Sequence, residues 1–474
     1  MSRKQRLQLG VSSFVLLAVA AVLWWLDAGG QQTVADAQAR IRAAGLPTTI
    51  DEIRPPRVPD ADNAALDLEK TQPLFAALPK IAGKDLWDWL TDFKKAHANA
   101  HRLRPAATQE LAGVLESPPV REIMVLVRKA VAQKGYEAHL SYEKGVAGMI
   151  PNVAPGQDSA RLLGWHARLA VSQDRPEQAY EDIWPMTVLA EFSANEPILL
   201  SQLSRHFKWL IALTELEQVA AQAPLPAAWN QKFSDRLAAL DLPEGLARSL
   251  DGERFAISLA TFEGMFRGQS LDGGLFGIQL DQWPDQIGDW PGWIGMQRYR
   301  FRSVIRQEYA SYLDGVRALR LAVVAPVPRY AEMKQKMEEI ERSVPAGRML
   351  VKQIVPDLIS LNKSLWKIPA RVISASVGLA LERYRTAKGG YPATLAELVP
   401  EFLPTVPVDI FSGQPLIYRT EPGGAVVYSV GPNLKDDGGV ENRETDKDDQ
   451  SWAAGAAAAR KFAPPQKPAA EAEP

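Results

Sequence analysis

Apolar residues recur at helical spacing along most of the chain from residue 63 to about residue 260. Leu111, Leu115 and Ile123, for example, fall on one face of a helix. Helical patterning returns at 297–321, and again at about 329–342, where abundant Lys and Glu predict a solvated face. We therefore expect a mainly α domain over residues 63–365, built as an irregular helical bundle.

Residues 162–180 (LLGWHARLAVSQDRPEQAY) predict a helix hairpin, because a polar segment with Pro176 separates two helical patterns. The hairpin has the small and aromatic positions of a tetratricopeptide-type unit. No clear period of about 34 residues, as in such repeats, runs through the chain. The bundle is therefore expected to contain at most one repeat-like hairpin.

The C-terminal region changes from one pattern to another within a short distance. Ile373, Val377, Leu381 and Tyr384 form one stripe of a helix, and Gly389-Gly390 is expected to end it. A short second helix follows at about 395–399. Two alternating, β-branched segments then predict a hairpin, with strands at 415–420 and 425–430. We expect a small α+β module over residues 366–452.

The N-terminus predicts a single membrane-spanning helix within residues 1–30. No ionisable side chain occurs from Leu7 to Leu26, which is about the length that a helix needs to cross a bilayer. Arg3, Lys4 and Arg6 precede it, and basic residues stay on the cytoplasmic side. We expect an uncleaved anchor in a bacterial inner membrane, with the bulk of the chain in the periplasm. The alternative is a cleaved signal peptide, whose apolar region is usually shorter.

Three further segments lack a regular pattern. Residues 31–62 contain a Pro-rich stretch and are expected to form a spacer above the membrane. Residues 264–295 are rich in Gly and carry Trp283, Trp290 and Trp293; they form either a binding platform or a cap packed on the helices. Residues 453–474 are rich in Ala and Pro and are expected to be disordered.

Composition narrows the classes of function. The 474 residues suffice for two or three domains. The net charge of −2 argues against nucleic acid as a partner. The absence of cysteine excludes disulfides, thiolate nucleophiles and Cys-ligated zinc.

The C-terminal segment 371–452 resembles the globular domain of the major pseudopilin of type II secretion systems. The resemblance rests on LALERYRTAKGGYPATLAELVPEFLPTVPVDIFSGQPLIYR, VYSVGPNLKDDGG and DKDDQSW, in this order. It implies a helix packed on a small antiparallel sheet, with a calcium ion pinning the last loop. The N-terminus departs from that family, because Gly10 is followed by VSSFV, with Val15 at the glutamate position, and residues 27–365 separate the apolar helix from the module. Processing and polymerisation as a pilin are therefore not expected.

The segment between Asn433 and Gln450 has the composition of a calcium loop. It holds seven acidic residues against three basic ones, and calcium takes six to eight oxygen ligands from flexible loops. The alternative is a solvated acidic loop without a metal. In the resemblance, Asn433 replaces an Asp and Leu434 a Gly, so the match is weaker there. The predicted calcium ligands are Asn433, Asp436, Asp437, Asp446, Asp448 and Asp449.

No arrangement of residues predicts catalysis or a bound organic cofactor. His97 and His101 share a helix face but lack the Glu of an HExxH motif and a third ligand. His139, His166 and His206 stand alone and are interpreted as packing or surface residues. We expect a non-enzymatic scaffold that binds a protein partner in the envelope, linked to type II secretion by the resemblance. The alternative is an envelope hydrolase with a site under the Trp-rich loop.

The predicted topology is testable with a reporter that is active only in the periplasm. Fused after residue 452, the reporter should be active, because the positive charges hold the N-terminus in the cytoplasm. Mass spectrometry of the mature chain should find residues 1–30 retained. Recovery of a soluble form that starts near Gln31 would contradict the anchor.

Overall fold

The computed structural model describes residues 28–97, 103–142, 151–258, 302–324, 330–344, 348–442 and 447–462, and short pieces at 148, 262, 264–266, 286–287 and 290–291. The predicted anchor, His101, Asp446, Trp283 and Trp293 lie outside these residues. Within the described part of the chain, no helix is long and apolar enough to cross a membrane.

The prediction of a mainly α fold with a small C-terminal sheet is confirmed. The described helices are η1 (Asp60–Asp62), α2 (Ala64–Glu69), α3 (Thr71–Ala76), α4 (Leu86–Ala96), α5 (Pro105–Leu115), α6 (Pro118–Val131), α8 (Ala154–Ser172), α9 (Pro176–Glu191), α10 (Leu199–Gln222), α11 (Ala227–Ala238), α12 (Leu242–Ile257), α13 (Gly264–Phe266), α15 (Arg302–Val323), α16 (Tyr330–Ser343), α17 (Met349–Leu365), α18 (Lys367–Lys388), η6 (Leu395–Leu398) and α19 (Ala456–Lys461). The strands are β1 (Gln286–Ile287), β2 (Trp290–Pro291), β3 (Ile417–Glu421), β4 (Gly424–Ser429), β5 (Glu441–Asn442), β6 (Lys447–Asp448) and β7 (Gln450–Gly455).

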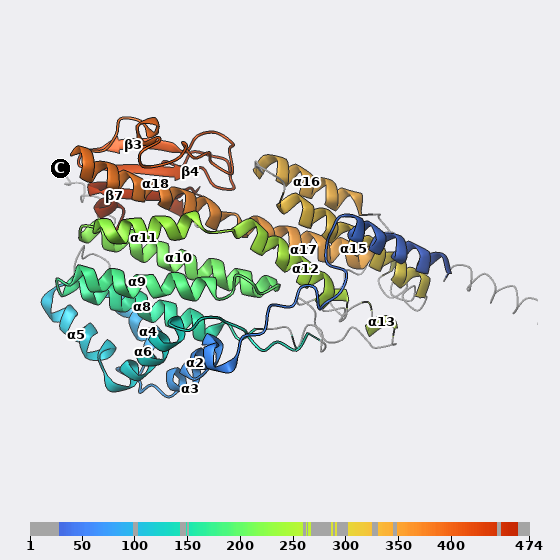
Figure 1. The fold of residues 1–474 in the computed structure, drawn as a ribbon, viewed down its shortest axis with the longest axis horizontal. Coiled ribbons are helices and arrows are strands. Elements are labelled where there is room, and N and C mark those ends of the chain that lie inside the picture. Colours follow the sequence, from blue (N-terminus) through green and yellow to red (C-terminus); the bar gives the residue numbers. More distant parts are fainter. Residues whose placement is uncertain are drawn as a thin grey trace, which may run out of the picture.

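The elements stack in layers across the long axis of the molecule, from top to bottom in Figure 1. The sheet lies outermost against α18, then come α11 and α10, then α9 and α8, and finally α4, α5 and α6. Helices α12, α15, α16 and α17 form the other end of the elongated body. Helix α10 contacts α8, α9, α12, α18, α19 and β7, so it lies at the centre of the arrangement.

The predicted helix hairpin is α8 followed by α9. The turn between them places Asp174 at φ +59°, and the Arg175 N–H donates to the Ala170 carbonyl, which caps α8. Pro176 then opens α9, where a missing N–H costs nothing.

The C-terminal module contains the predicted helix and hairpin. Helix α18 ends at Gly389, whose φ of +84° suits glycine. Strands β3, β4 and β7 pair antiparallel in that order, and Val427 lies opposite Trp452. Trp452 packs against Gly378 of α18 so closely that a Cβ there would lie 2.0 Å from the indole ring. The sheet therefore rests directly on the helix backbone.

The predicted boundary at residue 366 does not separate two cores. One buried cluster joins Leu68, Leu163 and Leu216 of the helical body to Leu381 and Trp452 of the C-terminal module. A second cluster holds residues from α12, α15 and α17 together with Phe411 and Val430 of the module. The module is thus continuous with the helical body, because both clusters cross the boundary.

Two segments predicted to lack regular structure are ordered. Residues 31–43 of the predicted spacer are helical, and Ala37 and Ile41, four residues apart, are buried in the second cluster. Residues 453–461 of the predicted tail complete β7 and form α19. The tail prediction is wrong there because Ala453, Ala454, Ala457 and Ala458 are buried. Small side chains suit a position where strand and helices lie close together.

Truncations test the role of the last strand and helix. A chain ending at Trp452 should unfold at a clearly lower temperature, because it loses Lys461 and the Ala453 N–H, both partners of the buried Glu217. Breaking a buried ion pair typically costs roughly 3–5 kcal/mol. A chain ending at Phe462 is the matched control, and thermal denaturation should find it close to the full chain. Equal melting of both truncations would contradict this packing.

Candidate functional site

The acidic loop, defined here as residues 431–449, leaves β4 through a series of tight turns. Gly431, Gly438 and Gly439 have φ values of +67°, +74° and +79°. Residues other than glycine rarely adopt such φ values. A Cβ on Gly431 would also lie 2.0 Å from the Asp448 carbonyl oxygen. The glycines therefore allow the two ends of the loop to lie against each other.

A buried carboxylate fixes the base of the loop. Asp409 accepts hydrogen bonds from the Ser429 hydroxyl at 2.6 Å and from the Val430 N–H at 3.2 Å. It also accepts from the Phe411 N–H and the Ser412 hydroxyl in its own turn. Asp409 thus ties the turn before β3 to the end of β4, where the acidic loop begins.

The loop folds back so that Asp437 and Asp449 come together. Oδ2 of Asp449 accepts from the N–H groups of Asp437 at 2.9 Å and Gly439 at 2.7 Å. Oδ2 of Asp437 accepts from the Asn433 amide at 2.8 Å and from the Asp448 N–H at 3.0 Å. Three of the predicted ligands, Asn433, Asp437 and Asp449, are therefore neighbours.

The other predicted ligands lie differently. Oδ1 of Asp436 accepts from the Tyr428 hydroxyl and from the Gly438 N–H, both at 2.9 Å. The Asp448 carboxylate forms an ion pair with Lys367 of α18. Asp446 lies outside the described residues. Asp436 stays at the rim of the cluster, whereas Asp448 is turned toward α18.

Asp449 is the least satisfied of these carboxylates. Its side chain is fully buried, and its Oδ1 atom has no hydrogen-bond partner among the residues that the structure describes. Burial and the charges of Asp437 and Asp436 raise its pKa to about 6, although the hydrogen bonds from the two backbone N–H groups lower it. A buried oxygen beside other carboxylates favours a positive charge at this point.

A complete metal site is not formed by carboxylates and histidines alone. Among the residues that the structure describes, no three His, Cys, Asp or Glu side chains are grouped to hold an ion. Asp449 Oδ1 fits a cation, whereas Asp448 is engaged with Lys367. An ion here would rely on Asp449, Asp437 and oxygens of amide or main-chain groups, which calcium accepts.

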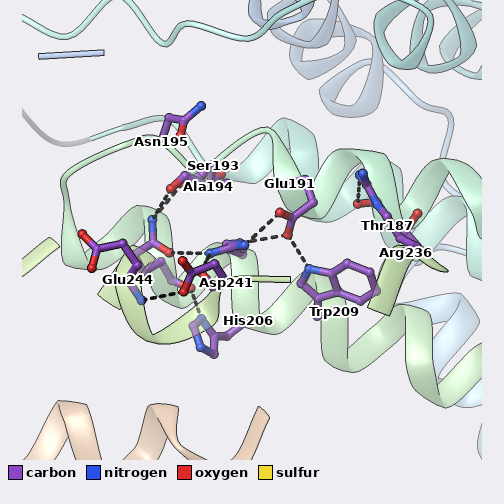
Figure 2. Close-up of polar contacts among 12 residues, drawn as sticks. Thr187, Glu191, Ser193, Ala194, Asn195, His206, Trp209, Arg236, Asp241 and Glu244 are labelled. Atoms are coloured by element: carbon purple, nitrogen blue, oxygen red, sulfur yellow. Dashed lines mark hydrogen bonds and ion pairs between the residues drawn. The ribbon is translucent and has the colours of Figure 1, made fainter. Parts of the chain in front are cut away.

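A second polar cluster surrounds α10 and was not predicted. Glu191 of α9 accepts from the Arg205 guanidinium at 2.8 and 2.9 Å and from the Trp209 indole at 2.7 Å (Figure 2). His206 contacts the Gln202 carbonyl through Nδ1, and burial lowers its pKa to about 4, so the ring is neutral. We interpret this cluster as structural, since each of its groups is paired within the core.

Lys208 and Ser193 form a pair of a kind that some hydrolases use. The Lys208 ammonium donates to the Ser193 hydroxyl at 3.1 Å, and burial lowers the lysine pKa to about 8. A Ser–Lys pair acts as a nucleophile and base only where substrate reaches it. Here both side chains are less than 5 % exposed, so we interpret this pair as structural too.

The isolated histidines show no ligand arrangement. His97 packs on Phe93, with ring centroids 4.4 Å apart. Burial lowers the pKa of His166 to about 4, which keeps it neutral. His139 contacts the Asn63 amide at 3.4 Å. Among the residues described, the acidic loop is therefore the strongest candidate site.

No protein-family model, no curated protein and no solved structure matches this chain. The interpretation of the acidic loop consequently rests on its own geometry and on the motifs of the C-terminal segment.

The raised pKa of Asp449 predicts a pH dependence in calcium-free buffer. Because its pKa in the folded state lies above the usual value near 4, the folded state binds this proton more tightly. The contribution of this group to stability is therefore complete below about pH 4 and is lost as the pH rises through about 6. Asp449→Asn, which stays neutral, should melt a few degrees above the wild type at pH 7.5, and the difference should shrink toward pH 4.5.

Thermal melts of both proteins with a chelator measure this difference. Glu401→Gln, an exposed change on another turn, is the control and should show no such trend. A constant difference between Asp449→Asn and the wild type across this pH range would contradict a buried, charged Asp449.

Proposed function

We infer that this protein is a non-enzymatic interaction protein of the bacterial envelope whose C-terminal module is stabilised by calcium. The observation that carries the inference is the buried Oδ1 of Asp449, which has no partner within the described part of the chain, while Oδ2 of the same carboxylate accepts from the Asp437 N–H. An uncompensated buried charge is costly. Calcium bound here supplies the positive charge and holds the two ends of the acidic loop together.

The residues for this role come from both ends of the loop. Asp449 and Asp437 provide carboxylates. Asn433 provides an amide oxygen, which also accepts from the Lys435 N–H, while its amide nitrogen donates to Asp437. Asp436 belongs to the same loop and accepts from the Gly438 N–H. Asp448 can bind the ion only if its ion pair with Lys367 is broken. Calcium suits such a set better than magnesium, because calcium tolerates irregular geometry and more ligands.

The motifs of the C-terminal segment support the same role. The GGYP turn, the LAELVP helix and the DKDDQSW end follow one another as in the type II pseudopilin head. Trp452 of the last motif anchors β7 on Gly378 of α18. The resemblance thus supports a link to secretion and the placement of calcium at the start of β7.

The envelope location rests on the N-terminal sequence. The uncharged stretch Leu7–Leu26, preceded by Arg3, Lys4 and Arg6, supports an inner-membrane anchor with a periplasmic body. The absence of cysteine means that stability in that compartment comes from packing and from bound ions, since no disulfide is available.

Calcium should raise the melting temperature of the full chain relative to chelator. Binding at about 100 times the dissociation constant adds roughly 2.7 kcal/mol to stability. Asp449→Asn should lose most of this effect, because it removes the charge that faces the ion. Magnesium should substitute poorly, since it requires tighter octahedral geometry.

His97→Ala is the matched control, since His97 directly follows α4, far along the chain from the acidic loop, and this variant should keep the full calcium effect. Differential scanning calorimetry measures both variants. Equal melting of the wild type with calcium and with chelator would refute the calcium site.

A further inference from the structure

Three adjoining cavities follow one side of α10 and form what we call the α10 groove. The largest, about 590 Å³, lies between α10, the sheet and α19. A cavity of about 210 Å³ shares Thr214 and Phe462 with it. A third, of about 410 Å³, shares Trp165 and Arg168 with the second. The shared residues show that the three cavities adjoin one another along α4, α8, α10 and α19.

The largest cavity carries an excess of positive charge. Four cations line it, against one carboxylate: Arg371, Arg419, Arg460, Lys461 and Glu421. Glu421 is shared by Arg419 and Arg460, at 3.3 and 2.5 Å. Glu217, behind the wall, is likewise shared by Arg371 and Lys461. Arg419 and Arg460 thus share one carboxylate, so among the described residues these two cations carry one positive charge more than their partner offsets.

The far end of the groove adds one more positive charge. Lys94 lines both smaller cavities, and among the described residues it forms no salt bridge. Burial of its ammonium and the charge of Arg168 lower the pKa of Lys94 from the ordinary value, although the residue as a whole is exposed. Arg168 itself is neutralised by Glu215 at 2.6 Å.

Apolar surface lies between these two charged ends. Phe93, Trp165 and Phe462 line the central cavity, and Val426 and Ala457 line the largest one. On α10 the residues that line the cavities run from Leu210 to Gln222, which is about 18 Å at 1.5 Å per residue, and the central cavity lies beyond the two end cavities along this helix. An extended peptide covers this distance with about five or six residues, at about 3.3 Å each. A small anion would fill only one end.

We propose that the α10 groove binds an extended segment of a partner protein that alternates acidic and apolar side chains. Carboxylates of the segment pair with Arg419 and Arg460 at one end and with Lys94 at the other. Its apolar side chains pack on Trp165 and Phe462 between them. This inference rests on the proposed role in binding a partner, but it requires no calcium.

The experiment measures binding of a fluorescein-labelled peptide of alternating Glu and Leu to the full chain by fluorescence anisotropy. Lys94→Gln and Arg460→Gln should each weaken binding about fivefold, the upper range for a partly exposed ion pair. Rising ionic strength should weaken it further, because the charges are screened. A peptide with Lys in place of Glu should not bind.

Lys95→Gln is the matched control. Lys95 follows Lys94 on α4, is exposed, has only a distant ionic contact with Asp92, and does not line the groove. Equal weakening by Lys95→Gln, or binding of the Lys peptide, would show nonspecific attraction and overturn the proposal. Displacement of the peptide by millimolar citrate or phosphate would assign the groove to small anions instead. Failure of the Glu peptide to bind would also overturn the proposal. The predicted effect of calcium on the melting temperature would not be affected by that result.

Discussion

The buried carboxylate of Glu217 is the interaction on which the arrangement of this molecule depends. It lies near the C-terminal end of α10 and is fully buried. It accepts from the Arg371 guanidinium, from the Lys461 ammonium at 2.8 and 3.0 Å, and from the Ala453 N–H at 2.6 Å. A carboxylate removed from water is strongly unfavourable unless such partners surround it. Its partners come from α18, β7 and α19, so α10 is paired correctly only when all three are in place. The charges of Arg371 and Lys461 keep the pKa of Glu217 below its ordinary value despite burial. The helical body and the C-terminal sheet are for this reason one cooperative structure.

The packing of α10 against α18, β7 and α19 also positions the two proposed sites, the acidic loop and the α10 groove. Strand β7 begins at Gln450, directly after Asp449, so the register of β7 on β4 decides where that carboxylate lies. Lys461, at the end of α19, and Phe462, which follows it, line the α10 groove. Arg419 connects the two regions, because it lines the groove and donates to the Gly438 carbonyl in the acidic loop at 2.9 Å. Arg419 therefore connects the acidic loop directly to the groove.

Local patterns predicted the helices and the hairpin, but they could not predict pairings between distant segments. The stripe of Ile373, Val377 and Leu381, and the glycines after it, specify α18 through neighbours along the chain alone. Glu217 and Arg371 are 154 residues apart, and nothing at either position shows that they meet. Richness in Ala and Pro predicts a disordered tail from residue 453, because alanine has little side chain to bury. Ala453, Ala454, Ala457 and Ala458 are nevertheless buried, since small side chains are what a closely packed strand and helix require. In the acidic loop, composition indicated carboxylates near one another. It did not show that Asp449 would be buried or that Asp448 would turn to Lys367.

The contact between Trp452 and Gly378 implies a rule for distant relatives of this chain. With the indole in place, position 378 has no room for a β-carbon. A lineage can therefore acquire alanine at 378 only after the tryptophan has been replaced by a smaller residue, and the two sites should change together. Such a pair, 74 positions apart by the numbering of Gly378 and Trp452, is a signature that survives when overall identity has faded. It offers a way to recognise the same helix-on-sheet joint in genomes where the rest of the chain has diverged.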